Sequence, residues 1–176
     1  MWPRRKVTNV IVYLVRHAPA GEYDAERWPD DSRRPLTPRG SRKFARAAAG
    51  LRQIAETPEV VLASPFVRAW ETAVILERCS GWPVPRASGF LSSGRRADDG
   101  LTALREVTGD GPVALVGHEP IMGELTSLLL TGDSARLSIP FKKGGIACLN
   151  IDRQVVPGGA TLVWLATPGM LRRINS

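Results

Sequence analysis

The chain has 176 residues, of which 43% are hydrophobic, enough to bury the core of one globular domain. We expect a single domain over residues 1–176, because no Gly/Ser-rich linker divides the sequence. The formal net charge of +7 raises the question of a nucleic-acid partner, but 20 of the 24 basic residues are scattered arginines without a basic and aromatic stacking motif. These features argue against nucleic acid, and no segment is typical of a membrane span.

The N-terminal segment imitates a secretory signal peptide. A basic stretch at residues 3–6 precedes an apolar run, and small residues follow at 18–20. We reject this interpretation because the run is short, Thr8 and Asn9 interrupt it, and a proline lies in the cleavage site. The two cysteines, Cys79 and Cys148, lie in different predicted elements, which indicates a reducing compartment and therefore a cytoplasmic protein.

Residues 10–18 read V-I-V-Y-L-V-R-H-A and predict a buried strand that ends in an adjacent Arg16 and His17. Open α/β sheets bind ligands at the carboxyl ends of their strands. A neutral imidazole there can attack an electrophile, and a guanidinium beside it can hold a phosphate or a carboxylate. We therefore expect the functional site at this strand end.

The polar segment 19–35, which contains three prolines, has two interpretations: a partial lid over the site or a plain surface connection. Thr37 followed by Pro38 is typical of a helix start, and the predicted helix runs through residues 39–55. Its alternating alanines and arginines predict one buried and one basic face.

A second strand is predicted at residues 59–64. Pro65 follows it, and we expect this proline to lie in the first turn of the next helix. Arg68 would then lie near the positive N-terminal end of that helix, where anions bind.

A third buried run, P-V-A-L-V-G-H, ends at His118, the second of only two histidines in the chain. A helix over about residues 120–130 should follow, with Leu125, Leu128 and Leu129 facing the core. Residues 146–151 and 160–166, separated by a Pro-Gly-Gly turn, predict an antiparallel hairpin, and a short terminal helix contains Met170 and Leu171. Together these elements predict an α/β fold with a mixed sheet flanked by helices.

Three predicted strand ends therefore supply two fixed cations and two imidazoles: Arg16, His17, Arg68 and His118. The cysteines lack metal-ligand spacing and no H-x-x-H pattern is present, so we expect no metal and no cofactor. An anion is the natural guest, and phosphate suits the two arginines.

Four segments in this order resemble the histidine phosphatase superfamily, and more closely its SixA-type phosphohistidine phosphatase branch: L-V-R-H-A-P-A (14–20), R-P-L-T-P-R-G (34–40), S-P-F-V-R-A-W-E-T-A (64–73) and V-G-H-E-P (116–120). The resemblance implies a three-layer α/β/α sandwich with a mostly parallel mixed sheet, as in phosphoglycerate mutase. It also implies that His17 is the phosphate-accepting nucleophile and that Arg16, Arg68 and His118 bind the phosphoryl oxygens.

The expected chemistry is attack by a neutral His17, with its other ring N–H held by a nearby carbonyl, followed by hydrolysis of the phosphohistidine enzyme. We expect adjacent cations to lower the pKa of His17 and bound phosphate to raise the pKa of His118. The basic pair Arg95 and Arg96 either steers an acidic partner or is a solvated charge pair.

The carboxylic general acid of other branches has no obvious counterpart, because the segment S-G-F-L-S-S-G-R-R contains no Asp or Glu. Candidates elsewhere are Glu22, Asp24 and Glu119. Each has a plain alternative, since loop carboxylates are usually solvated and Glu119 can cap the helix that starts at Pro120. The lack of a clear acid favours a labile P–N bond over a phosphate ester.

Three functional hypotheses follow. The first is a phosphatase that dephosphorylates phosphohistidine in a signalling phosphotransfer protein. The second is a small-molecule phosphomonoester phosphatase or mutase of the same superfamily, favoured if one of the three carboxyls reaches the leaving group. The third is a non-catalytic phosphate-binding module, against which the presence of all four pocket residues argues.

Overall fold

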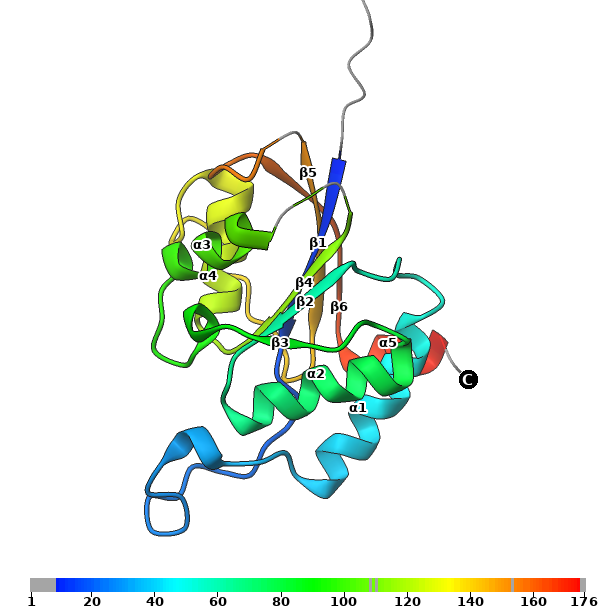
Figure 1. Ribbon diagram of the computed structural model, residues 1–176, viewed down its shortest axis with the longest axis vertical. Coiled ribbons are helices and arrows are strands. Elements are labelled where there is room, and N and C mark those ends of the chain that lie inside the picture. The colour runs from blue at the N-terminus through cyan, green and yellow to red at the C-terminus, as the bar shows by residue number, and fades with distance from the viewer. Residues whose placement is uncertain (1–8, 108, 110, 153, 175–176) are drawn as a thin grey trace, which may run out of the picture.

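The computed structural model describes residues 9–107, 109, 111–152 and 154–174, and they contain a six-stranded sheet in the order β3-β2-β4-β1-β5-β6 (Figure 1). The first four strands of this order run parallel to their neighbours, and β5 is antiparallel to both β1 and β6. The predicted mostly parallel mixed sheet is therefore confirmed. The strand bounds are β1 Asn9–Arg16, β2 Val60–Ala63, β3 Arg86–Ala87, β4 Val113–Gly117, β5 Ile146–Asp152 and β6 Ala160–Ala166.

Helices cover both faces of the sheet, which confirms the three-layer α/β/α sandwich (Figure 1). One face is covered by α1 (Pro38–Leu51), α2 (Val67–Ser80) and α5 (Pro168–Ile174), and the other by α3 (Ala97–Val107) and α4 (Ile121–Thr131). Two short 3-10 helices, η1 (Asp31–Arg33) and η2 (Gly89–Leu91), lie in the connections.

The strand β1 feeds both cores by simple alternation of its side chains. Val12 and Leu14 belong to the cluster under α3 and α4, whereas Tyr13 and Val15 belong to the cluster under α1, α2 and α5. All four are 2% exposed or less. This two-sided burial explains why the strand is an uninterrupted apolar run in the sequence.

The register of the parallel strands places their carboxyl ends at one level. Arg16 of β1 pairs with Gly117 of β4, and Ala63 of β2 pairs with Val116 of β4. The residues that follow these three strands therefore lie at the same edge of the sheet. All three are polar: His17, Ser64 and His118.

Most local predictions are confirmed. Thr37 caps α1 by accepting a 2.9 Å hydrogen bond from the Gly40 N–H, and the hairpin of β5 and β6 forms as expected. The three leucines of α4 that we expected in the core are buried, and so is Cys148. The terminal helix α5 buries Leu171 but leaves Met170 exposed.

Two boundaries were predicted wrongly. The helix α1 ends at Leu51 rather than continuing to residue 55, because the chain turns after the buried Leu51. Pro65 does not lie in the first turn of α2, since Phe66 has extended dihedral angles and is the N-cap residue. Arg68 nevertheless lies in that first turn, as expected.

The basic stretch at residues 3–6 and Thr8, on which the signal-peptide question depends, lie outside the described residues. Among the residues that are described, no helix is long and apolar enough to cross a membrane.

Candidate active site

The two histidines face each other at the carboxyl edge of the sheet. Their ring centroids are 5.2 Å apart with an angle of 56° between the ring planes. His17 is 6% exposed and His118 is 2% exposed, so both imidazoles are largely removed from water. The structure therefore brings together the two residues that the sequence places at separate strand ends.

His17 is oriented by hydrogen bonds on both its ring and its backbone. Its Nδ1 lies 2.7 Å from the Ala18 carbonyl oxygen, and because a carbonyl only accepts, Nδ1 carries the proton. The lone pair of the neutral ring is then on Nε2. The His17 N–H donates to the Gly117 carbonyl at 2.9 Å, and the Ala18 N–H donates to Thr72 Oγ1 at 2.9 Å, which fixes the strand end against β4 and α2.

His118 is held by Ser64, the residue that follows β2. The His118 Nε2 lies 2.9 Å from Ser64 Oγ, and Ser64 Oγ also accepts the Phe66 N–H at 3.2 Å. The Phe66 ring packs edge-on against the His118 ring at a centroid distance of 5.2 Å. A side chain from the end of β2 and one from the start of α2 thus hold the His118 imidazole.

Arg68 is buried beside the histidines and is bound by one loop residue. Its Nη2 lies 2.8 Å from Asp31 Oδ2, and its Nη1 donates to the Asp31 carbonyl oxygen at 2.8 Å. Asp31 also pairs with Arg34 at 2.7 Å. Burial acts to raise the pKa of Asp31, but the hydrogen bond from Arg34 and the charge of Arg68 outweigh it and lower that pKa.

Arg16 completes the cluster and donates from Nη1 to the Phe141 carbonyl oxygen at 2.5 Å. Three buried side-chain nitrogens of the cluster have no hydrogen-bond partner among the described residues: Arg16 Nε, Arg68 Nε and His118 Nδ1. Buried polar groups are normally paired, so this set of nitrogens suits a guest that offers several acceptor oxygens.

Both imidazoles are neutral at neutral pH. Burial lowers the pKa of His17 to about 4, with Arg68 and Arg16 adding to this effect against the hydrogen bond to Ala18. Burial also lowers the pKa of His118 to about 3, and the neighbouring His17 and Arg68 contribute. The expected direction for His17 is confirmed, although burial is a larger cause than the cations. The expected rise in the pKa of His118 on phosphate binding stays a prediction.

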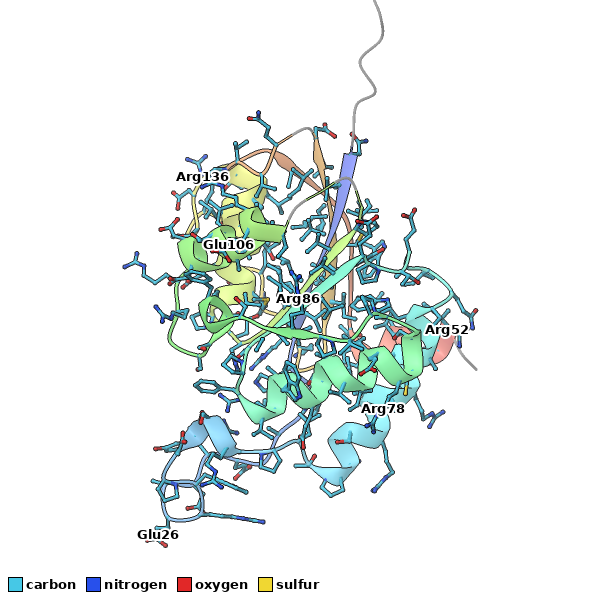
Figure 2. The ribbon with its side chains drawn as sticks, viewed as in Figure 1. Glu26, Arg52, Arg78, Arg86, Glu106 and Arg136 are labelled. Carbon is cyan, nitrogen blue, oxygen red and sulfur yellow. The ribbon has the colours of Figure 1, made fainter. Side chains whose placement is uncertain are left out.

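The cluster opens into a pocket of about 540 Å³ that is walled on one side by the segment 19–35. Gly21, Glu22, Tyr23 and Asp31 line this side, and Arg34 fastens the segment by donating to the Gly21 carbonyl. The remainder of the segment projects from the body of the molecule, with Glu26 near its tip (Figure 2). The segment forms a wall of the pocket, and its role as a lid stays a prediction.

The three candidate acids have different positions. Glu22 and Glu119 line the pocket, whereas Asp24 is not among the lining residues and accepts the N–H groups of Glu26 and Arg27 instead. Glu119 is half-buried and its Oε1 accepts the Phe141 N–H at 2.9 Å. Burial raises the pKa of Glu119 against the effect of its backbone hydrogen bonds, one of them from Gly123 in the first turn of α4. Pro120 is the N-cap residue of α4 and provides no side-chain capping hydrogen bond, so the capping role of Glu119 stays a prediction.

Sequence reasoning missed Asp31, Ser64 and Thr72 as residues of the site. Ser64 and Thr72 fall within the segment 64–73 that carries the family resemblance, so that motif is the signal that identifies them. Asp31 begins the short 3-10 helix η1 in a segment without periodicity, and the sequence carried no such signal for it. Within the described ranges, no group of three His, Cys, Asp or Glu side chains is arranged to hold a metal ion.

Comparison with known proteins identifies relatives over nearly the whole chain. The sequence profile of the histidine phosphatase superfamily (branch 1) matches residues 12–90. The chain is 30% identical over 165 residues to the phosphohistidine phosphatase SixA of Escherichia coli strain K12, an alignment that covers 92% of this chain and 96% of the relative.

Solved structures agree with this relationship. A structure of the protein histidine phosphatase SixA complexed with tungstate superimposes with a TM-score of 0.77 at 28% identity, covering 90% of this chain and 97% of the other. A SixA-type structure from Nakamurella multipartitia superimposes with a TM-score of 0.75 at 26% identity, covering 91% of this chain and 96% of the other.

Proposed function

The chain belongs to the histidine phosphatase superfamily, and from this premise we propose that it hydrolyses phosphohistidine in a phosphorylated signalling protein through a phosphohistidine enzyme intermediate. One observation carries the proposal: a neutral His17 whose Nδ1 is committed to the Ala18 carbonyl at 2.7 Å, which leaves the Nε2 lone pair for attack.

In the first step, His17 Nε2 attacks the phosphorus atom and the P–N bond of the substrate breaks. The departing imidazole leaves as a neutral ring once its second nitrogen is protonated from solvent, so this step needs no carboxylic acid. In the second step, water attacks the phosphorus, the bond to His17 Nε2 breaks, and inorganic phosphate leaves with the proton released to solvent. Phosphoryl transfer of this kind depends mainly on positioning and on positive charge around the equatorial oxygens.

Arg16, Arg68 and His118 supply the contacts to those oxygens. The Nε atoms of both arginines and the Nδ1 of His118 have no other partner among the described side chains. Ser64 Oγ accepts the Phe66 N–H and can donate its hydroxyl proton to His118 Nε2, which lies 2.9 Å away. In the proposed state the His118 proton is then on Nδ1, and that atom donates to a phosphoryl oxygen.

A second candidate function is hydrolysis of a small phosphomonoester, because Glu22 and Glu119 line the pocket. An alkoxide leaving group needs a proton donor within hydrogen-bond reach. Glu119 supports this less strongly than its position suggests, since its carboxylate is already engaged by backbone N–H groups. We therefore place the P–N substrate first.

The proposal includes a cytoplasmic setting, in which Cys79 and Cys148 stay reduced. Both are free cysteines in the structure, and Cys148 is a buried residue of the core.

The test compares hydrolysis of a phosphohistidine-bearing phosphotransfer protein, p-nitrophenyl phosphate and a phosphoglycerate by the wild type and by His17→Ala. We expect preference for the phosphoprotein, loss of all turnover in His17→Ala, and an acid-labile phosphoenzyme in the wild type only. Tungstate, an oxyanion present in the related SixA structure, should compete with substrate.

Turnover retained by a folded His17→Ala variant would exclude His17 as the nucleophile. Faster turnover of either phosphomonoester would favour the second candidate function. No turnover of any substrate, together with phosphate binding, would favour the non-catalytic module.

A further inference from the structure

A basic groove adjoins the catalytic pocket on the side of the turn that precedes β5. It has a volume of about 330 Å³ and lies between the middle of α1, the turn at residues 142–145 and the start of α5. Its charged lining residues are Lys43, Lys142, Lys143 and Arg172, and none of the described residues that line it is acidic. The catalytic pocket differs, because three carboxylates line it.

Lysine is rare in this chain, yet most of its lysines line this groove. The sequence has only four lysines among its 24 basic residues, and three of them line this groove. A lysine ammonium is a compact charge on a flexible stem that adapts to carboxylates at varied positions, whereas an arginine fork favours one planar partner. The groove is therefore suited to several carboxylates of an irregular partner.

The turn that carries two of these lysines is hydrogen-bonded to the end of β1, next to His17. The Gly144 N–H donates to the carbonyls of Arg16 and His17 at 3.1 and 2.9 Å, and the Arg16 N–H donates to Gly145 at 3.1 Å. Gly144 has a φ of +79°, and a Cβ there would lie 2.9 Å from the Phe44 ring. Only glycine fits, so the backbone of the turn is held in one position beside His17.

Lys143 connects the groove to the catalytic pocket, because it lines both. Its positive charge also contributes to the lowered pKa of His17. Lys43 and Lys142 line the groove but not the catalytic pocket. The groove is therefore within reach of a chain that places a phosphorylated side chain over His17.

We propose that this groove binds an acidic segment of the protein substrate next to its phosphohistidine. This inference rests on the proposed function and states which protein substrates the site prefers. Pro19 and Pro168 also line the groove, and their partly exposed apolar rings suit the aliphatic parts of a peptide. Phe44 is 1% exposed and is the one aromatic residue of the lining, so the described groove has no platform on which nucleic-acid bases could stack.

The experiment uses two synthetic phosphohistidine peptides of equal length, one with Asp and Glu flanking the phosphohistidine and one with Ser and Ala. Phosphoramidate serves as the small substrate. The variants are Lys142→Glu and Lys43→Glu, which come from different elements. The matched control is Arg86→Glu, an exposed residue of β3 at the far edge of the sheet (Figure 2). Thermal unfolding checks that all variants are folded.

We expect the wild type and Arg86→Glu to prefer the acidic peptide by about tenfold in kcat/KM at low ionic strength, and the preference should shrink as salt is added. Each lysine variant should lose most of this preference and hydrolyse phosphoramidate at the wild-type rate. An excess of the unphosphorylated acidic peptide should inhibit hydrolysis of the acidic phosphopeptide by the wild type.

Equal kcat/KM for both peptides in the wild type, or a preference unchanged in both lysine variants, would overturn the groove assignment while leaving the proposed function intact. An equal loss for phosphoramidate would also overturn it, because the lysines would then act on the phosphoryl group itself. Stronger inhibition by a single-stranded oligonucleotide than by the acidic peptide would assign the groove to nucleic acid instead. If the wild type hydrolyses neither peptide but hydrolyses p-nitrophenyl phosphate, the proposed function fails and this inference with it.

Discussion

Asp31 holds both terminal nitrogens of Arg68, one through its carboxylate and one through its backbone carbonyl, each at 2.8 Å. A residue from the segment 19–35 therefore sets the position of a guanidinium in the pocket beside His17. The lowered pKa of Asp31 keeps it ionised at neutral pH, so it serves as a partner of Arg68 rather than as a proton donor.

Asp31→Asn should lower kcat/KM by about tenfold, because Arg68 loses a charge-assisted hydrogen bond that positions it. The fold should persist, since Asp31 is only half-buried. Asp24→Asn is the matched control: Asp24 lies in the same loop but does not line the pocket, and an Asn side chain still accepts its backbone hydrogen bonds. Steady-state kinetics on phosphoramidate measure the effect, and equal activity of both variants would contradict the positioning role.

Arg68→Ala should lower kcat/KM by about 100-fold or more, the usual cost of removing one donor to a developing oxyanion. Arg68→Lys should recover only a small part, because an ammonium cannot reproduce the fork of contacts. Arg78→Ala serves as the control on the same helix, since Arg78 is exposed at the far end of α2 (Figure 2). If Arg68→Ala keeps wild-type kinetics, Arg68 does not bind the phosphoryl group.

The pH dependence of stability should follow the two buried histidines. Their pKa values are about 4 and about 3 when folded, and a histidine in the unfolded chain has a pKa of about 6.5. The unfolded chain therefore binds protons that the folded protein does not. Their contribution to stability is fully present above about pH 6.5 and is lost as the pH falls toward the folded pKa values, by up to about 1.4 kcal/mol per pH unit for each histidine.

Urea unfolding between about pH 4.5 and about pH 7.5 measures this slope, which should be shallower in His118→Asn. NMR spectra give an independent check, because the chain has only two histidines and their signals can be assigned from single variants. Neither ring should titrate near its ordinary pKa of about 6.5. A midpoint there would contradict the burial argument.

Gly40→Ala should destabilise the protein by about 2 kcal/mol, despite the higher helix propensity of alanine. A Cβ at Gly40 would lie 2.2 Å from the carbonyl oxygen of Pro19, which lies just after β1 and His17. The control is Gly89→Ala, where a Cβ meets nothing within 4 Å and the change should stay within about 0.5 kcal/mol. Equal free energies of unfolding for the two variants would mean that the backbone at Pro19 can move away from the new Cβ without loss of stability.

Much of the fold was predictable because its signals are local. The buried strands before His17 and His118 are short apolar runs, and Thr37 before Pro38 marks the start of α1. The errors also have local causes. Pro65 has the usual pattern of a first-turn proline, but the chain stays extended through Phe66, whose ring packs against His118. The start of that helix therefore coincides with a contact between residues distant in sequence, which a local pattern cannot reveal.

The sequence by itself indicated the strands that end at Arg16 and His118, the hairpin of β5 and β6, and the motifs that identify the superfamily, but it gave no prediction of β3 or α3. Only the tertiary structure decided that Asp31 binds Arg68 across 37 residues, that Ser64 meets His118 across 54, and that three lysines share one groove. The physical reason is that strand and helix preferences act between near neighbours. Ion pairs, tautomers and the burial that keeps both imidazoles neutral depend on which distant segments pack together and exclude water.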